Sequence, residues 1–215
     1  MTTHEMKTAA LVLCGGKSQR MGQPKHLLPF GDETLLHRVI GVLHSVVQRV
    51  GVVASAEQSL PALPDRITVF RDEQPDLGPL SGLATGLTAF ATQADAVYAS
   101  SCDAPFLHHQ FVTRMFDHLG DADLVMLKED RYHHPLAAVY RTRIATVVRQ
   151  LVDERRLRPI FLLEECNAKV ISTNEIRDVD PELLSLRNVN TPDEYQAALK
   201  LADLVPNDDD GVQQR

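Results

Sequence analysis

Short apolar runs alternate with helical segments along the first hundred residues of this chain. The apolar runs cover residues 9–13, 50–54, 67–70 and 94–100, and the helical segments cover residues 34–47 and 77–93. Continuous apolar strands, buried on both faces, are typical of parallel sheets. This order predicts an α/β fold, a single domain with a mostly parallel, Rossmann-like sheet covered by helices. Ligands of such sheets lie at the carboxyl ends of the strands.

The second half of the chain continues the alternation. We expect a helix over residues 110–119, strands over 123–127 and 136–140 joined as a hairpin, helices over 144–152 and 160–165, and a strand over 168–171. The last helix starts after Thr191, a good N-cap, with Pro192 in its first turn. We assign residues 1–205 to a single domain and the polar residues 206–215 to a disordered tail.

The composition excludes several classes of protein. Of the 215 residues, 44% are hydrophobic and 24% are charged, as in ordinary globular proteins. The net charge of −7 argues against a duplex nucleic-acid binder. No apolar run approaches the roughly 20 residues that cross a membrane, and the N-terminus lacks a secretory signal. The three cysteines are far apart and suggest neither a disulfide framework nor a metal knuckle. We therefore expect a cytoplasmic protein without a nucleic-acid or membrane partner.

The first apolar run ends at the pair Gly15 and Gly16. Two glycines let the backbone fold tightly around an anion and direct its N–H groups inward. Ser18 adds a hydroxyl donor, and Arg20 and Lys25 add positive charge suited to phosphate. The order of residues matches neither a Walker A loop nor GxGxxG. The segment therefore predicts a different kind of site for the phosphates of a nucleotide.

Asp103 follows the fourth apolar run directly, and Pro105 restricts the turn after it. Magnesium prefers hard oxygen ligands and commonly takes one or two protein carboxylates together with substrate phosphates and water. The alternative role for Asp103 is to cap the helix that starts near Leu107. Because a phosphate-binding turn lies upstream, we favour Asp103 as the ligand of a Mg²⁺ cofactor.

Residues 13–22, LCGGKSQRMG, followed by Lys25, resemble the entry signature of the MobA-like nucleotidyltransferases. Further elements of that family follow in the same order, namely RDEQPDLGPLSGL at 71–83, HHPL at 133–136, ERRL at 154–157 and NVNTP at 188–192. In this family the HP element precedes a strand. The resemblance extends from about residue 8 to residue 200 and implies the fold of the nucleotide-diphospho-sugar transferases.

The resemblance implies an enzyme that transfers GMP from GTP to molybdopterin and releases pyrophosphate. It gives catalytic roles to Arg20, Lys25 and Asp103, and a nucleotide-binding role to Leu13, Cys14, Gly15, Gly16, Ser18, Lys25, Ser55, Asp72, Gly78, Gly82 and Asp103. It assigns molybdopterin binding to Arg155, Arg156, Asn188 and Asn190. Asp76 lies in the same loop as Asp72, so the two acids can exchange roles. A molybdopterin-insertion protein or a molybdoenzyme chaperone is the expected protein partner.

The identity of the base is the most open point of this interpretation. The Gly15–Gly16 pair resembles the guanylyl branch, whereas cytidylyl relatives usually have Ala-Gly there. Ser55 stands where guanylyl enzymes often have an Asn that helps to read the base, and a Ser reaches less far. Three alternatives remain, namely a cytidylyltransferase acting on molybdopterin, a sugar-1-phosphate nucleotidyltransferase of the same fold, and a non-enzymatic carrier of the molybdenum cofactor. The presence of Arg20, Lys25 and Asp103 favours an enzyme.

Overall fold

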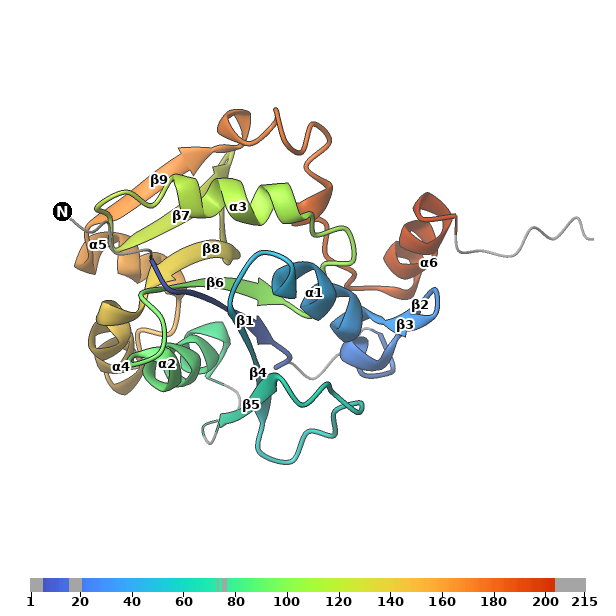
Figure 1. Ribbon diagram of the computed structural model, residues 1–215, viewed down its shortest axis with the longest axis horizontal. Coiled ribbons are helices and arrows are strands. Elements are labelled where there is room, and N and C mark those ends of the chain that lie inside the picture. The colour runs from blue at the N-terminus through green and yellow to red at the C-terminus, as the bar shows by residue number, and fades with distance from the viewer. Residues whose placement is uncertain (1–5, 16–20, 73, 75–76, 204–215) are drawn as a thin grey trace, which may run out of the picture.

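A sheet of seven strands organises the computed structural model, which describes residues 6–15, 21–72, 74 and 77–203 (Figure 1). In chain order the strands are β1 (Thr8–Leu13), β4 (Arg49–Ser55), β5 (Ile67–Asp72), β6 (Ala96–Ser101), β7 (Leu124–Glu129), β8 (Tyr132–Arg141) and β9 (Ala168–Ser172). Their order in the sheet is β5-β4-β1-β6-β8-β7-β9. Strand β8 runs antiparallel to its neighbours β6 and β7, and the other pairs are parallel. The predicted α/β fold with a mostly parallel sheet is confirmed.

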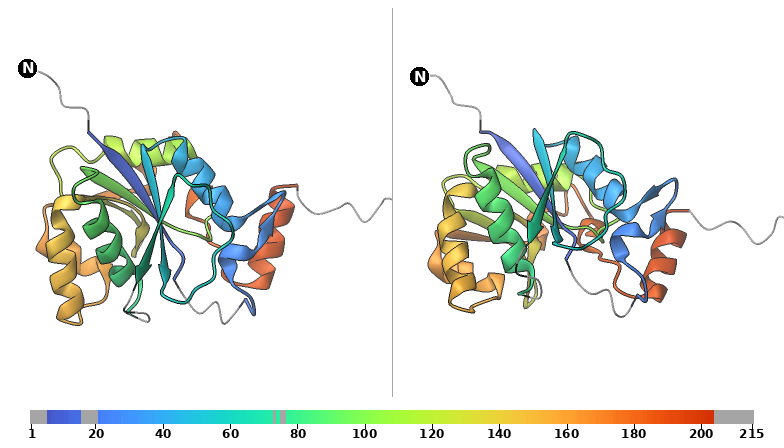
Figure 2. Two further views of the ribbon diagram at one scale, coloured as in Figure 1. Left: turned by 60° about the horizontal axis from the view of Figure 1, so that its bottom comes forward. Right: turned by 90° about the horizontal axis from the view of Figure 1, so that it is seen from below.

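Helices cover both faces of the sheet (Figures 1 and 2). Helices α1 (Leu35–His44) and α3 (His109–Asp117) pack on one face, and α2 (Pro79–Phe90) and α4 (Ala145–Asp153) pack on the other. The shorter helical elements are η1 (Lys25–Leu27), η2 (Thr142–Ile144), η3 (Pro159–Phe161), α5 (Leu162–Glu165), η4 (Thr173–Glu175) and η5 (Leu184–Leu186), and the last helix is α6 (Pro192–Leu201). The helix expected over residues 160–165 is thus a 3₁₀ turn followed by one α-helical turn.

Strand β1 shows why the apolar runs are continuous. Ala10 and Val12 point into the hydrophobic core under α1 and α3, whereas Leu11 and Leu13 point into the core under α2 and α4. All four side chains are buried. A strand with helices on both faces has no solvent side, so its sequence loses the alternation of polar and apolar residues.

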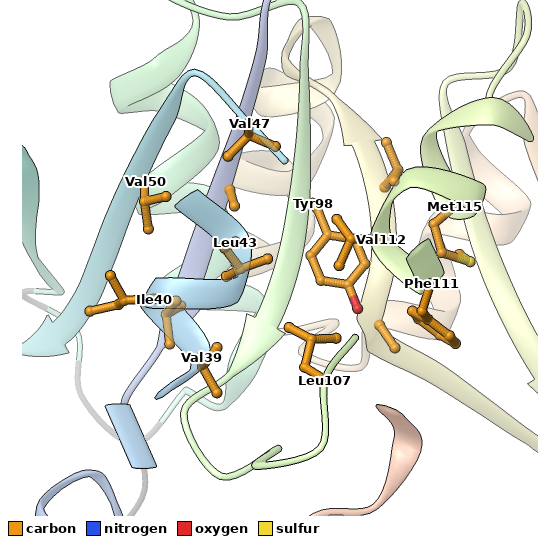
Figure 3. Packing of buried hydrophobic residues seen from close by; sticks show 14 of the residues in the cluster. Val39, Ile40, Leu43, Val47, Val50, Tyr98, Leu107, Phe111, Val112 and Met115 are labelled. Atoms are coloured by element: carbon orange, nitrogen blue, oxygen red, sulfur yellow. The ribbon is translucent and has the colours of Figure 1, made fainter. Parts of the chain in front are cut away.

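Tyr98 of β6 places a phenol among aliphatic side chains of α1 and α3 (Figure 3). The residue is fully buried, and its hydroxyl has no hydrogen-bond partner among the residues described. Burial also raises the pKa of Tyr98 far above its usual value. Because a buried hydroxyl without a partner costs free energy, Tyr98→Phe should increase the free energy of unfolding by about 1 kcal/mol in urea denaturation.

Tyr140 of β8 provides a matched control for this prediction. It is equally buried, but its hydroxyl donates a hydrogen bond of 2.8 Å to the carbonyl oxygen of Pro135. Tyr140→Phe removes a satisfied hydroxyl and leaves that carbonyl without its donor, so it should lower the free energy of unfolding by about 1 kcal/mol. Two changes of the same sign would contradict this account of the two hydroxyls.

A third, smaller hydrophobic cluster lies beside the sheet, where α6 meets the short hairpin β2 (Pro29–Phe30) and β3 (Glu33–Thr34) (Figure 1). Its buried members are Met21, Leu28, Phe30, Leu35, Val189 and Ala198. The hydroxyl of Tyr195 donates a hydrogen bond to the carbonyl oxygen of Pro29. The cluster therefore fastens the segment before α1 to the last helix of the chain.

The N-terminus of α6 has the predicted cap. The Thr191 hydroxyl accepts a hydrogen bond from the backbone N–H of Glu194, whose carboxylate accepts one from the backbone N–H of Thr191, and Pro192 is the first helical residue. This reciprocal arrangement satisfies two backbone donors that a helix start leaves without partners. It also fixes the direction in which residues 188–190 enter the helix.

The HP element corrects one expectation. His133, His134 and Pro135 were expected to precede a strand, but they lie within β8, which begins at Tyr132. The pairing of β7 with β8 shifts register between Met126 and Leu127. Such an irregularity tolerates a proline, which cannot donate a ladder hydrogen bond. The predicted hairpin of β7 and β8 is confirmed. Strand β8 begins at Tyr132, earlier than the apolar pattern indicates.

Several predicted positions lie outside the described residues. They are Gly16, Ser18, Arg20, Asp76 and the expected tail, residues 206–215. Within the described ranges, none of the helices combines the length and the apolar character needed to cross a bilayer.

Candidate active site

The carboxyl ends of four parallel strands meet at one edge of the sheet. Leu13, the last residue of β1, pairs with Val53 of β4 on one side and with Ser101 at the end of β6 on the other. Ser55 at the end of β4 pairs with Asp72 at the end of β5. The topology thus brings the predicted positions from these strands to one edge, where sheets of this kind bind ligands.

Lys25 connects three distant parts of the chain at this edge. Among its contacts, the ammonium Nζ donates hydrogen bonds to Asp103 Oδ2 at 2.7 Å and to Asn190 Oδ1 at 2.8 Å. Lys25 begins η1, Asp103 follows β6, and Asn190 precedes α6. Lys25 is therefore in direct contact with Asp103 and Asn190, and the resemblance assigns all three residues to nucleotide or acceptor binding.

Asp103 has an unsatisfied acceptor suited to a metal ion. The residue is 7% exposed, and Oδ1 is buried without a hydrogen-bond partner among the residues described. A buried carboxylate oxygen without a donor costs free energy, and a hard cation such as Mg²⁺ would satisfy it. The described ranges contain no cluster of three or more His, Cys, Asp or Glu side chains for a metal. The donor set therefore fits an ion that completes its coordination with substrate oxygens and water.

The segment 188–190 is held against the loop after β6. The backbone N–H of Val189 donates a hydrogen bond of 2.9 Å to the carbonyl oxygen of Asp103. The Ser101 hydroxyl lies 3.5 Å from Asn188 Oδ1, at the limit of a hydrogen bond. Both asparagines of the predicted motif therefore lie at the end of β6, next to the candidate metal ligand.

Asp72 accepts two hydrogen bonds on one carboxylate oxygen. The hydroxyl of Ser81 in α2 donates to Oδ1 at 2.9 Å, and the backbone N–H of Gln74 donates to the same atom at 3.1 Å. These contacts fix the acid at the end of β5 beside Ser55. The bond from Ser81 ties the start of α2 to the same edge of the sheet.

Gly78 and Gly82, two predicted nucleotide-binding positions, require glycine for different structural reasons. Gly78 has a φ of 75° at the N-cap of α2, a conformation that favours glycine. A Cβ at Gly82 would approach Leu13 Cδ2 to 3.1 Å, so glycine there lets α2 pack closely on β1. A Cβ at Gly15 would meet none of the described atoms within 4 Å, so packing within the described residues does not require glycine there.

Cys14 and Cys102 are buried neighbours on the face under α1 and α3. The pKa of the Cys102 thiol is held well above its usual value. The larger cause is a hydrogen bond with the Cys14 thiol, and burial adds to it. A thiol with a raised pKa is protonated and unreactive near neutral pH. The side chain of Cys102 therefore acts as a small hydrophobic group beside the site.

Residues 10–169 match the model of the MobA-like NTP transferase domain. A probable molybdenum cofactor guanylyltransferase of Methanosarcina acetivorans is 33% identical over 205 residues, which cover 89% of each chain. The chain belongs to the MobA-like NTP transferase family. The expected family and the expected enzyme class, a nucleotidyltransferase, are confirmed.

Solved structures share the fold of this MobA-like chain. The molybdopterin-guanine dinucleotide biosynthesis protein A of Archaeoglobus fulgidus has a TM-score of 0.75 at 20% identity, over 92% of this chain and 100% of that one. A Mycobacterium tuberculosis protein solved in complex with manganese has a TM-score of 0.65 at 16% identity, over 90% of this chain and 98% of its own. The nucleotidyltransferase fold predicted from the resemblance is therefore confirmed.

The two predicted arginines of this MobA-like chain lie after α4. Arg155 has a φ of 61°, and it ends the helix at a position where glycine is usual. Arg156 forms ion pairs with Glu154, Glu164 and Glu165, the shortest of them 2.6 Å, and its guanidinium stacks on Phe161. Within the described residues these contacts connect Arg156 to α5 rather than to Lys25 or Asp103.

Sequence reasoning missed two residues of this MobA-like site, His26 and Gln58. His26 is buried in η1 next to Lys25, and the amide of Gln58 contacts His26 and the ends of β1 and β4. No periodicity or motif marks a lone Gln in a loop. The nearest signal is that Gln58 follows three residues after Ser55, the position at which the resemblance led us to expect an Asn.

Proposed function

We propose that this nucleotidyltransferase transfers GMP from GTP to molybdopterin, forming molybdopterin guanine dinucleotide and pyrophosphate. The observation that carries the proposal is the contact of Lys25 with both Asp103 and Asn190. It joins a cation suited to phosphates, a carboxylate suited to Mg²⁺ and an amide of the segment assigned to the acceptor. The names of the relatives support the same substrates.

The reaction needs positioning and charge neutralisation more than acid–base chemistry. The terminal phosphate oxygen of molybdopterin attacks the α-phosphorus of GTP, a new P–O bond forms, and the bond to the bridging oxygen of pyrophosphate breaks. A phosphate monoester has a second pKa of about 6 and is mostly dianionic near pH 7, so the attacking group needs no dedicated base. Lys25 would neutralise charge on the transferred phosphate, together with Arg20.

Mg²⁺ is the proposed cofactor, with Asp103 as its protein ligand. When bound, the ion would neutralise charge that develops on the phosphate oxygens. Asp103 would hold Lys25 through Oδ2 and present Oδ1 to the ion, so one carboxylate would position both cations. Close spacing of two cations is tolerable there because triphosphate carries several negative charges.

The nucleoside would lie over the ends of β1, β4 and β5. Leu13, Cys14 and the Gly15–Gly16 turn would contact the nucleotide through their backbone, with Ser18 as a further donor. Ser55, Asp72, Gly78 and Gly82 complete this proposed half of the site, because β4 and β5 end there side by side. The guanine preference remains part of the proposal.

The acceptor would bind on the side of β6 and α6. Asn188 and Asn190 would donate to its phosphate, and Arg155 and Arg156 would contribute from the end of α4. For Arg156 this would require the guanidinium to exchange acidic partners for phosphate, since Glu165 now lies 2.6 Å from it. We place the reaction in the cytoplasm, with transfer of the product to a molybdopterin-insertion protein or a molybdoenzyme chaperone.

Pyrophosphate release by the purified protein tests this function. The protein is supplied with Mg²⁺, molybdopterin and either GTP or CTP, and we expect release with GTP at a rate at least tenfold higher than with CTP. Omitting molybdopterin or chelating the metal should abolish release. A preference for CTP would reassign the chain to the cytidylyl branch, and turnover with a sugar 1-phosphate instead of molybdopterin would replace the acceptor.

A further inference from the structure

The side-chain amide of Gln58 connects β1, β4 and η1 at the active-site edge of the sheet. Its Oε1 accepts a hydrogen bond of 3.3 Å from the backbone N–H of Ser55, the last residue of β4. Its Nε2 donates to the carbonyl oxygen of Cys14, just after β1, at 2.9 Å and lies 3.0 Å from His26 Nδ1 in η1. Gln58 is therefore the link between the two strand ends and the turn that begins with Lys25.

The partners of His26 fix the direction of each of these hydrogen bonds. His26 Nε2 lies 2.8 Å from the carbonyl oxygen of Ser59, which can only accept, so Nε2 carries the proton. In the neutral ring Nδ1 is then an acceptor and takes a hydrogen from the Gln58 amide. Both amide hydrogens of Gln58 are used, one on Nδ1 and one on Cys14. Reversing the amide would place two oxygens together, so the network has one consistent arrangement.

The loop that carries Gln58 is itself held from β5. The Arg71 guanidinium donates from Nη1 to the carbonyl oxygen of Gln58 at 2.7 Å and to that of Ser55 at 3.1 Å. The backbone N–H of Gln58 also donates to the carbonyl of Ser55 at 3.1 Å. The amide is therefore attached to a braced turn and cannot follow η1 freely.

Lys25 depends on this brace because it is the neighbour of His26. His26 is 4% exposed and has hydrogen bonds on both ring nitrogens, so η1 is anchored on one side by the loop after β4. On the other side Lys25 reaches Asp103 and Asn190. A displacement of η1 would move the ammonium away from the phosphate position that the proposed function requires.

We propose that Gln58 is a positioning residue for this reaction, acting through His26 to fix the Lys25 ammonium. The inference rests on the proposed function.

Gln58→Met tests the proposal, since methionine keeps the length of the side chain and removes its hydrogen bonds. A shift of a reacting group by about 1 Å can cost on the order of a hundredfold, so we expect kcat of pyrophosphate release from GTP to fall about 10- to 100-fold. The KM for GTP should rise less than kcat falls, because the phosphate charge that Lys25 stabilises develops in the transition state.

A double-mutant cycle with Lys25→Met separates positioning from a structural role. If Gln58 acts through Lys25, Gln58→Met should cost less than about threefold once Lys25 is already replaced, because effects that share one group are not additive. His26→Leu should show the same coupling by an independent route, and it decides the question if Gln58→Met does not fold. Equal factors in both backgrounds would overturn the proposal.

Gln93→Met is the matched control, because Gln93 is exposed beyond the opposite end of α2 and its amide bonds only a helix carbonyl among the described residues. Its kcat should stay within about twofold of the wild type. Absence of GTP turnover by the wild-type protein would refute the proposed function. Turnover by the wild type with an unchanged Gln58→Met variant would refute the positioning role alone.

Discussion

Asp103→Asn should lower the rate of pyrophosphate release on the order of a thousandfold, the loss that follows removal of a preorganised electrostatic group. Asparagine keeps the shape of the side chain, and its oxygen can still accept from Lys25. It removes the negative charge that would hold Mg²⁺ at Oδ1 and that now lies 2.7 Å from the Lys25 ammonium. Steady-state kinetics at saturating GTP and Mg²⁺ measure the loss.

Asp123→Asn is the control for this change. Asp123 precedes β7 at the opposite edge of the sheet. Its carboxylate pairs with Arg143 at 2.6 Å and accepts a hydrogen bond from the backbone N–H of Asn167. Burial raises the pKa of this carboxyl, but these two contacts outweigh burial and hold the pKa below its usual value. Its replacement removes the same charge far from the site, so kcat should remain within about twofold. If the kcat of the Asp103→Asn variant stays within tenfold of the wild type, the proposed role of Asp103 as a metal ligand is wrong.

Gly86→Ala should reduce the free energy of unfolding by about 2 to 3 kcal/mol, at the upper end of the range for overpacking a core. A Cβ on Gly86 would lie 2.2 Å from Leu11 Cδ1 and 2.6 Å from Cδ2. Leu11 is fully buried in the core between α2 and β1, and close-packed cores leave a side chain little room to move. Urea denaturation with an unchanged m-value measures the effect.

Gly41→Ala makes the same substitution in a helix with the opposite expectation. Gly41 lies on the exposed face of α1, and a Cβ there would meet nothing within 4 Å. Alanine costs less conformational entropy in a helix than glycine, so the variant should be more stable by about 0.5 to 1 kcal/mol. Destabilisation by both variants would mean that the close approach of α2 to β1 does not decide the first result.

The fold could be predicted because its strands are short, apolar and closely followed by turn residues. The run at residues 9–13 is apolar throughout since α1 and α2 cover opposite faces of β1. The start of β8 was not predicted, because His133, His134 and Pro135 carry no strand pattern. Burial lowers the pKa of His134 against the opposing effect of Glu129, an environment that its sequence neighbours do not reveal.

The site could be predicted only where its residues form motifs along the chain. Asp103 and Asn190 follow recognisable segments, but their contact with Lys25 joins positions 78 and 165 residues away from it. His26 and Gln58 were missed because their roles arise from a hydrogen bond between two loops, which local periodicity does not encode. Arg156 shows the reverse case. The ERRL motif predicts a substrate contact for it, but the fold places Glu164 and Glu165 against its guanidinium.

The fastening of α6 to the hairpin β2–β3 has a consequence for synthesis on the ribosome. The sheet ends with β9 at Ser172, so every strand can pair while the last part of the chain is still in the exit tunnel. Lys25 gains its contact with Asn190, and the third cluster gains Val189 and Ala198, only after that part emerges. A chain that has emerged only as far as β9 would therefore have its sheet but not the contact of Lys25 with Asn190, and under the proposed function it would transfer no nucleotide before residues 188–201 emerge.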